Sequence, residues 1–245
     1  MPARGITDHG NMHGAYEMYT NCVANGVKPI IGIEAYVTPE TARQDKSRVH
    51  WGTEAQRRDD VSGGGLITHL TMWAENDEGL VNLIKASSVA NLEGRVMRYP
   101  RMDKEVLATY SKGVIASSGC PSGIIQTRLR LGQFEEALRA AGEFQDIFGK
   151  DNFFIELMDH GLTIETQVTN DLLTIAKKLD APLLATNDSH YVHAEDAQAQ
   201  DAMLCINSGS RLDDPDRFKF DGTGYYIKTA EEMRELFKDH PDACD

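Results

Sequence analysis

Short apolar segments alternate with amphipathic segments along almost the whole of this sequence. The apolar segments have the length of strands, whereas the amphipathic ones repeat their apolar positions with a helical period. This alternation is typical of a mostly parallel sheet covered by helices. There is no dinucleotide-binding glycine fingerprint, so the pattern favours an α/β barrel over a Rossmann sheet. The expected strands cover 5–7, 28–37, 66–74, 113–118, 153–158 and 182–186, and the expected helices cover 12–25, 77–91, 121–131, 134–148, 163–179 and 197–206.

Length and composition narrow the class of protein. A chain of 245 residues suits one large domain and can bury a core without disulfides. The sequence shows neither a run of about 20 apolar residues nor a signal-peptide layout, so we expect a cytoplasmic protein. Its four cysteines are far apart and form no CxxC pair, which argues against a zinc ribbon and for reduced thiols.

The charge balance limits how such a chain could handle nucleic acid. Lys and Arg number 25 against 38 Asp and Glu, a formal net charge of −13. Affinity for a nucleic-acid duplex comes mainly from cations that neutralise phosphates. An acidic chain that acts on nucleic acid therefore needs bound metals or a basic neighbour. The polar segment 40–60 interrupts the strand and helix pattern, and a long insertion of this kind is either a functional lid or disordered.

Side chains suited to metal binding occur at or near the ends of nearly every expected strand. In an α/β barrel the active site forms where strands pass into the loops that follow them. Imidazole, carboxylate and thiolate groups together are metal ligands, and ligands spread along the chain in this way suit a cluster of two or three ions. Such a cluster hydrolyses phosphate esters by activating a water and stabilising the attacking and leaving oxygens. The candidates are Asp8, His9, Glu34, His69, Cys120, Glu156, Asp159, Asp188 and His190.

The pair Asp188 and His190 is the most telling of these, because residues i and i+2 of an extended segment face the same way and reach one ion. Glu34 lies among apolar residues, where an unpaired charge is costly, so a ligand or ion-pair role is favoured. His69 could equally be a core histidine. Cys120 on its own would more often be a small buried apolar residue.

Other polar residues have simpler explanations beside the functional one. Asp8 and His9 could cap the helix that follows them, and for Asp8 this explanation is favoured. Tyr99 and Arg101 belong to a basic and aromatic cluster that could touch a nucleic-acid backbone, although a solvated loop explains it as well. His160 and His193 have no nearby residue in the sequence that would indicate a role for them. No P-loop and no serine-hydrolase elbow is present.

At these residues the sequence resembles a known family. The segments TDHGNM, IIGIEAYVTP, LTMWAENDEGLVNLIKASS, SSGCPSGII, NFFIELMDHG, ATNDSHYV and GYYIKTAEEM are similar to those of the polymerase and histidinol phosphatase (PHP) domain. More narrowly, they resemble that domain in bacterial DNA polymerase III alpha subunits of the actinobacterial type. The resemblance extends over 1–245 and implies one domain with a distorted (β/α)7 barrel of the PHP type.

The resemblance also implies a function and a ligand set. It implies a metal-dependent 3′→5′ exonuclease that proofreads for the polymerase, with two or three divalent metals, zinc or manganese, or else iron or magnesium. The partners it implies are a DNA primer 3′ end, the remaining polymerase domains, the sliding clamp and other replisome subunits. Tyr99 and Arg101 would contact the substrate. The residues that match the family's metal motifs are His9, Glu34, His69, Cys120, Asp188 and His190.

Two features depart from the family pattern. The family's initial H-x-H motif and a following Asp have no counterpart here, so we expect a barrel truncated at its N-terminus, with unpaired strand edges and little activity. Arg4 occupies a position where the family has an apolar residue. One alternative function is a scaffold that stabilises the polymerase and binds a separate exonuclease subunit. Another is a phosphatase of the histidinol-phosphate type, against which the segments GYYIKTAEEM and ENDEGLVNLIKASS count.

Overall fold

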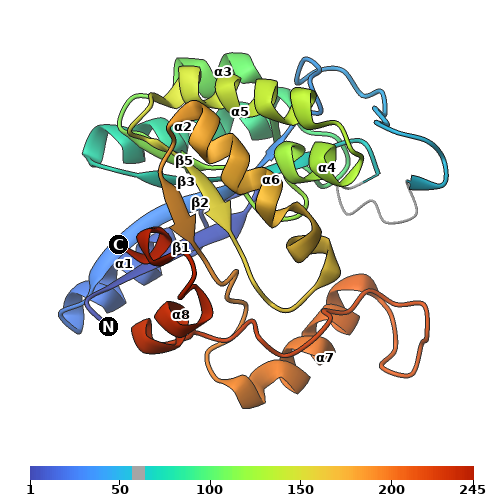
Figure 1. Ribbon diagram of the computed structural model, residues 1–245. Coiled ribbons are helices and arrows are strands. Elements are labelled where there is room, and N and C mark those ends of the chain that lie inside the picture. Colours follow the sequence, from blue (N-terminus) through green and yellow to red (C-terminus); the bar gives the residue numbers. More distant parts are fainter. Residues whose placement is uncertain (57–63) are drawn as a thin grey trace.

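One curled, mostly parallel sheet organises the fold (Figure 1). The structure, a computed structural model, describes residues 1–56 and 64–245. The sheet has the strand order β1-β2-β3-β5-β6-β7, and the short β4 pairs with β2 beside this path. The expected α/β class with a distorted barrel is confirmed. The strands are β1 (Ala3–His9), β2 (Lys28–Val37), β3 (Thr68–Ala74), β4 (Arg101–Met102), β5 (Val114–Ser117), β6 (Phe153–Leu157) and β7 (Leu183–Ala185).

Strand β3 departs from the parallel pattern. It runs antiparallel to both of its neighbours, β2 and β5, whereas the other four pairings are parallel. A parallel neighbour requires a crossover connection, usually a helix. The connection 38–67 has no α-helix in its described residues, and the chain returns along β2 in the opposite direction. As a result, the beginning of β3 lies beside the end of β2.

Helices cover the sheet unequally. Helices α2 to α6 lie together above the sheet in Figure 1, and α7 and α8 lie below it. Helix α5 shows why these elements form: its buried residues Ala137, Ala140, Ala141, Phe144 and Phe148 make one apolar stripe. The helices are α1 (Ala15–Ala24), α2 (Asp77–Glu93), α3 (Lys104–Thr109), α4 (Ile124–Arg130), α5 (Phe134–Phe148), α6 (Thr163–Leu179), α7 (Ala197–Ser208) and α8 (Ala230–Leu236).

The core lies between the sheet and its upper helices. Ile33, Leu70 and Phe153 of the sheet are fully buried and belong to the same apolar cluster as the stripe of α5. No helix in the described part of the chain has the length and apolar character needed to cross a bilayer.

The described part of the polar insertion, 40–56, is tied to the body of the protein. Glu40 accepts hydrogen bonds from Arg128 and Arg139, and the guanidinium of Arg128 lies 4.0 Å from the ring centre of Trp51. Arg43 pairs with Asp103, Glu93 and Glu105. The expectation of disorder is therefore wrong for 40–56, while 57–60 lies outside the described residues.

A cavity of about 630 Å³ opens between the two edge strands, β1 and β7. Its walls include every residue of β1 together with Thr186 to His190. Arg4 is among these wall residues, and burial lowers the pKa of its guanidinium. The cavity leads from the open side of the sheet to the predicted metal ligands.

Candidate metal centre

Four of the six predicted ligands form one compact cluster. His69 Nδ1 lies 2.6 Å from Glu34 Oε1, and His9 Nδ1 lies 3.6 Å from Glu34 Oε2. Cys120 Sγ is 3.4 Å from both Glu34 Oε1 and His69 Nδ1. One ligand atom from each of His9, Glu34 and His69 falls within 4.8 Å of the others. Distances of this size suit donors that converge on a shared cation.

Strand pairing explains why these four meet. His9 is the register partner of Glu34 in the parallel pair β1–β2. Glu34 pairs with Thr71 on β3, and His69 is two residues from Thr71 and therefore faces the same side. The backbone turns sharply after His9 at Gly10, with φ of 64°. A Cβ at this glycine would lie 2.5 Å from the ring of Tyr36, which itself stacks on His9.

Asp188 and His190 complete the group from the loop after β7. Both line the same cavity as His9, Glu34 and Cys120, and the His190 and His9 ring centres are 6.3 Å apart. The expected extended geometry of this pair is wrong, because Asp188 has a left-handed backbone with φ of 41°. His190 Nδ1 instead donates to the carbonyl of Asp188 at 2.6 Å. This bond directs the Nε2 lone pair of His190 away, free to bind an ion.

The electrostatics fit a site for cations. Burial raises the pKa of Glu34, but the hydrogen bond from His69 and the charges of His69 and His9 outweigh it and lower the pKa to about 2. Burial, followed by the charge of Glu34, raises the pKa of Asp188 and that of the Cys120 thiol. Acidic groups that oppose one another's ionisation in one cavity become stable as anions when a metal supplies positive charge. The donor set therefore fits divalent metals.

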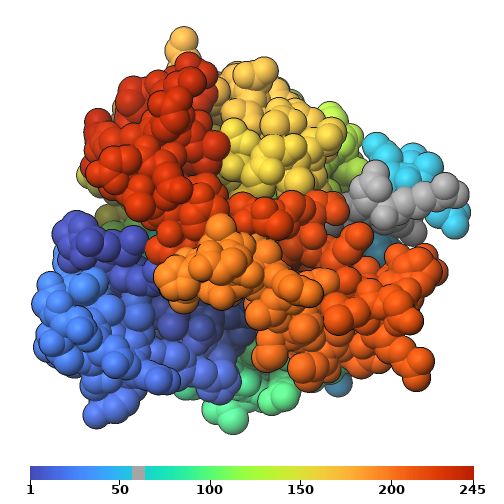
Figure 2. Space-filling view, turned by 90° about the horizontal axis from the view of Figure 1, so that it is seen from below, coloured from blue at the N-terminus to red at the C-terminus, as the bar shows by residue number. Residues whose placement is uncertain are grey.

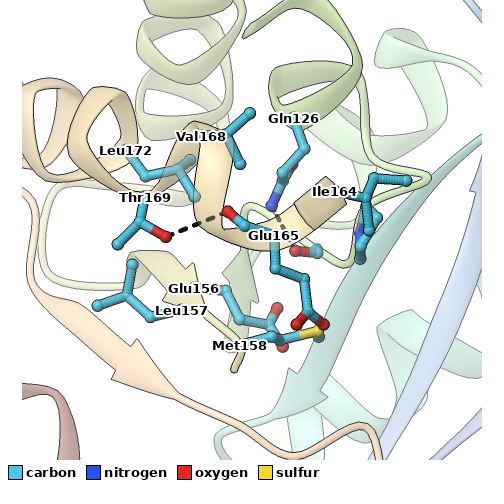
Figure 3. Close-up of a pocket in the computed structure, with 11 residues that line it drawn as sticks. Gln126, Glu156, Leu157, Met158, Ile164, Glu165, Val168, Thr169 and Leu172 are labelled. Carbon is cyan, nitrogen blue, oxygen red and sulfur yellow. Dashed lines mark hydrogen bonds between the residues drawn. The ribbon is translucent and has the colours of Figure 1, made fainter. Parts of the chain in front are cut away.

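Glu156 lies beside this group but has hydroxyl partners of its own. Ser117 Oγ and Thr186 Oγ1 each donate to its carboxylate at 2.5 Å, linking β5 and β7 through β6. Burial raises the pKa of Glu156 to about 7. Figure 3 shows Glu156 with Glu165 at a small cavity of about 20 Å³, room for a single water. Glu156 is a buried neighbour of the predicted metal ligands and lines the same cavity as five of them.

Asp8 has the capping role that its position favoured. Its Oδ2 accepts the backbone N–H of Gly14, at the start of α1, at 2.7 Å. Asp159 accepts the backbone N–H of Gly161 in a turn. Neither carboxylate is needed to explain the metal cluster.

The two residues predicted to contact substrate lie in different surroundings. Tyr99 is partly exposed, and its ring packs edge-on against Tyr36, the residue that stacks on His9. Arg101 is fully buried, and its guanidinium donates to the carbonyls of Gly94, Leu66, Arg43 and Asp45. The prediction that Arg101 contacts substrate is therefore wrong. Its guanidinium instead holds residues 43–45 against the body of the protein.

His160 supports the loop that carries Asp188, a role that the sequence did not reveal. The ring donates from Nδ1 to Glu165 at 2.6 Å and from Nε2 to the carbonyl of Asn187 at 3.0 Å. With acceptors on both nitrogens the ring is favoured as a cation, and the hydrogen bond and charge of Glu165 outweigh burial to raise its pKa. The partners lie 5 and 27 residues away in the chain, so no short-range spacing signals this contact.

Comparisons with known proteins agree with this geometry. A family model described as "PHP domain" matches residues 1–160. The chain is 55% identical over 246 residues to the DNA polymerase III subunit alpha of Mycobacterium tuberculosis (strain H37Rv), covering 100% of this chain and 21% of that protein. It is 55% identical over 253 residues to the same subunit of Saccharopolyspora erythraea, with the same coverage. For Thermus aquaticus the identity is 42% over 240 residues, or 96% of this chain and 18% of that protein. The chain thus spans about a fifth of the length of these curated relatives.

Proposed function

The chain belongs to the PHP domain family, in the form found in DNA polymerase III alpha subunits, and from this premise we propose that it is a metal-dependent 3′→5′ exonuclease module. Five of the six predicted metal ligands line one cavity, and the sixth, His69, contacts Glu34 and Cys120; this gathering of six side chains is the observation that carries the proposal. Two are provided by the loop after β7 and four by strands β1 to β3 and the loop after β5. The proposed reaction is hydrolysis of the terminal phosphodiester of a DNA primer strand.

The proposed role of each residue follows from its environment. Glu34 is central, since His69, His9 and Cys120 all contact it, and it holds the cluster together as an anion. His190 is oriented by the Asp188 carbonyl and presents Nε2. Divalent metals bound by these residues would lower the pKa of a water and stabilise the attacking and leaving oxygens. Tyr99 and Tyr36 form an aromatic wall next to His9, where substrate could pack.

The proposal extends to the setting of the domain. We infer that the chain acts in the cytoplasm beside the remaining polymerase domains, which would deliver the primer end. Contacts with a sliding clamp and other replisome subunits follow from the same premise. The net negative charge of the chain agrees with this proposal, since the basic surface that binds duplex DNA would lie on the remaining polymerase domains.

The test combines metal analysis with a choice of substrates. The purified chain is expected to retain zinc or manganese after gel filtration and to shorten a mismatched primer from its 3′ end slowly, in keeping with the low activity expected from its sequence. Glu34→Gln should remove metal and activity, whereas Glu17→Gln, an exposed glutamate on α1, should change neither. Bound metal with preference for histidinol phosphate would refute the nuclease assignment. A chain that binds no metal would support the scaffold alternative instead.

A further inference from the structure

A second cavity, of about 470 Å³, lies next to the metal centre. It is formed between α7 and the segment 219–223, on the face seen in Figure 2, where both are drawn in orange. Its volume falls in the range of about 300–1,000 Å³ that is usual for small-molecule sites. Nothing in the assignment of the six metal ligands accounts for it.

The cavity and the metal centre share a wall. Tyr191, which lines the cavity, directly follows His190. Phe220 lines the cavity as well, and its ring packs edge-on against His190 with 4.6 Å between centres. Phe220 also stacks on Tyr225 at 4.7 Å and packs edge-on against Phe218 at 5.8 Å, and Tyr225 in turn stacks on His160 at 4.1 Å. Phe220 is therefore held in place by a ladder of rings that begins in the buried support of the metal loop.

The segment that carries Phe220 is anchored on α7. Arg217 binds Asp201 through two hydrogen bonds of 2.5 and 2.6 Å and also donates to the carbonyl of Leu212. A bidentate Arg–carboxylate pair fixes orientation as well as distance. The aromatic wall is thus positioned before any ligand arrives.

The cavity's chemistry points to a planar, uncharged, hydrogen-bonding group. Tyr191 and Phe220 offer aromatic surface, and Gln198 and Gln200 offer amide donors and acceptors. The charged residues of the lining are Lys219, Glu195 and Asp201, the last of which is paired with Arg217, so the cavity has no excess of cations for a phosphate chain. A nucleobase matches this combination, because bases stack on aromatic rings and present polar edges.

We propose that this cavity receives the 3′-terminal base of a single-stranded nucleic acid, stacked on Phe220 with its edge toward Gln198 and Gln200. The proposal rests on the proposed function, since it places the adjoining phosphodiester at the metal centre across the shared wall. It specifies that function further: the substrate is a frayed, unstacked end, and Lys219 of the cavity lining is a cation that could contact the incoming strand.

The test uses a single-stranded oligonucleotide whose 3′-terminal nucleotide carries 2-aminopurine, joined through a phosphorothioate linkage that resists hydrolysis. Stacking quenches the fluorescence of this base. With the whole chain and manganese, we expect strong quenching at the 3′ end and little when 2-aminopurine is internal. Phe220→Leu should weaken binding by about tenfold and abolish the quenching, because one base stack contributes this much. The matched control is Tyr16→Leu on α1, which removes an aromatic ring that is 80% exposed and outside the cavity lining, and this variant should bind normally.

Because Phe220 packs against His190, its replacement also changes the surroundings of His190, and a second variant is needed that leaves Phe220 in place. Ala197→Met adds a larger side chain to the cavity lining from α7 and leaves Phe220 in place, so it should also reduce terminal quenching. Circular dichroism checks that each variant is folded. Equal quenching in all variants, equal quenching of terminal and internal bases, or loss in Tyr16→Leu as well would overturn the proposal. Hydrolysis of the unmodified oligonucleotide is scored separately: if it fails while terminal quenching behaves as expected, the nuclease function falls and the base site stands.

Discussion

Replacing Arg101 by methionine should destabilise the whole domain rather than weaken substrate binding. The guanidinium of Arg101 is 0% exposed and donates to four main-chain carbonyls. Those of Gly94 and Leu66 lie in buried contacts, where water cannot readily replace the lost donor. The Gly94 carbonyl also accepts the backbone N–H of residue 101 at 3.4 Å and keeps this donor, so among the described hydrogen bonds the Leu66 carbonyl is the buried acceptor that loses its partner. A buried acceptor without a partner costs about 1–3 kcal/mol, which is the predicted loss. The other two carbonyls, in the partly buried 40s segment, add less.

Thermal and urea unfolding, followed by circular dichroism, measure this loss. For a domain of this size each kcal/mol lowers Tm by about 2–4 °C, so Arg101→Met should lower it by at least about 2 °C. Arg98→Met is the matched control, since Arg98 is exposed and contacts only the neighbouring Tyr99 in the described bonds. The reasoning is refuted if Arg101→Met unfolds at the wild-type temperature while its affinity for DNA falls.

Three further predictions address the site itself. Asp8→Ala should cost about 1 kcal/mol through the lost cap on α1 and leave the metal content unchanged; lost metal would make Asp8 a ligand. In metal-free buffer Glu156→Gln should be more stable than wild type at pH 8 and similar at pH 4. The folded carboxyl binds its proton up to pH about 7 and the unfolded one up to about 4.5, so wild-type stability falls by up to about 3 kcal/mol as pH rises through this window. Saturating zinc or manganese should raise Tm by mass action, and EDTA should reverse the rise; an unchanged Tm would count against a metal centre.

Regular elements with strong periodicity could be predicted closely from the sequence. The predicted strand 28–37 and helices 134–148 and 163–179 have the bounds of β2, α5 and α6. Strand β4 has two residues and α3 has six, too few for a period to show. Helix α8 could have been found, because Thr229 and Glu232 form a capping box. The direction of β3 could not be predicted from the residues of β3. It depends on the path of the long connection between β2 and β3, which returns the chain antiparallel to β2.

For the candidate site, too, the features that depend on local sequence could be predicted and those that depend on distant segments could not. Residue type and position after strands were enough to select His9, Glu34, His69 and Cys120, which the fold brings together. The sequence could not show that Arg101 is buried, because burial of a charge depends on acceptors supplied by distant segments.

The left-handed backbone at Asp188 places function and stability in opposition at one residue. Its φ of 41° is a conformation that glycine adopts freely and that costs another residue about 1–3 kcal/mol. A mutation to glycine would therefore relax the loop while it removes a carboxylate from the proposed metal centre. In relatives that no longer need to bind metal, this position is expected to change to a residue that tolerates a left-handed backbone better, such as glycine. Such a change would mark the loss of metal binding before the rest of the fold changes.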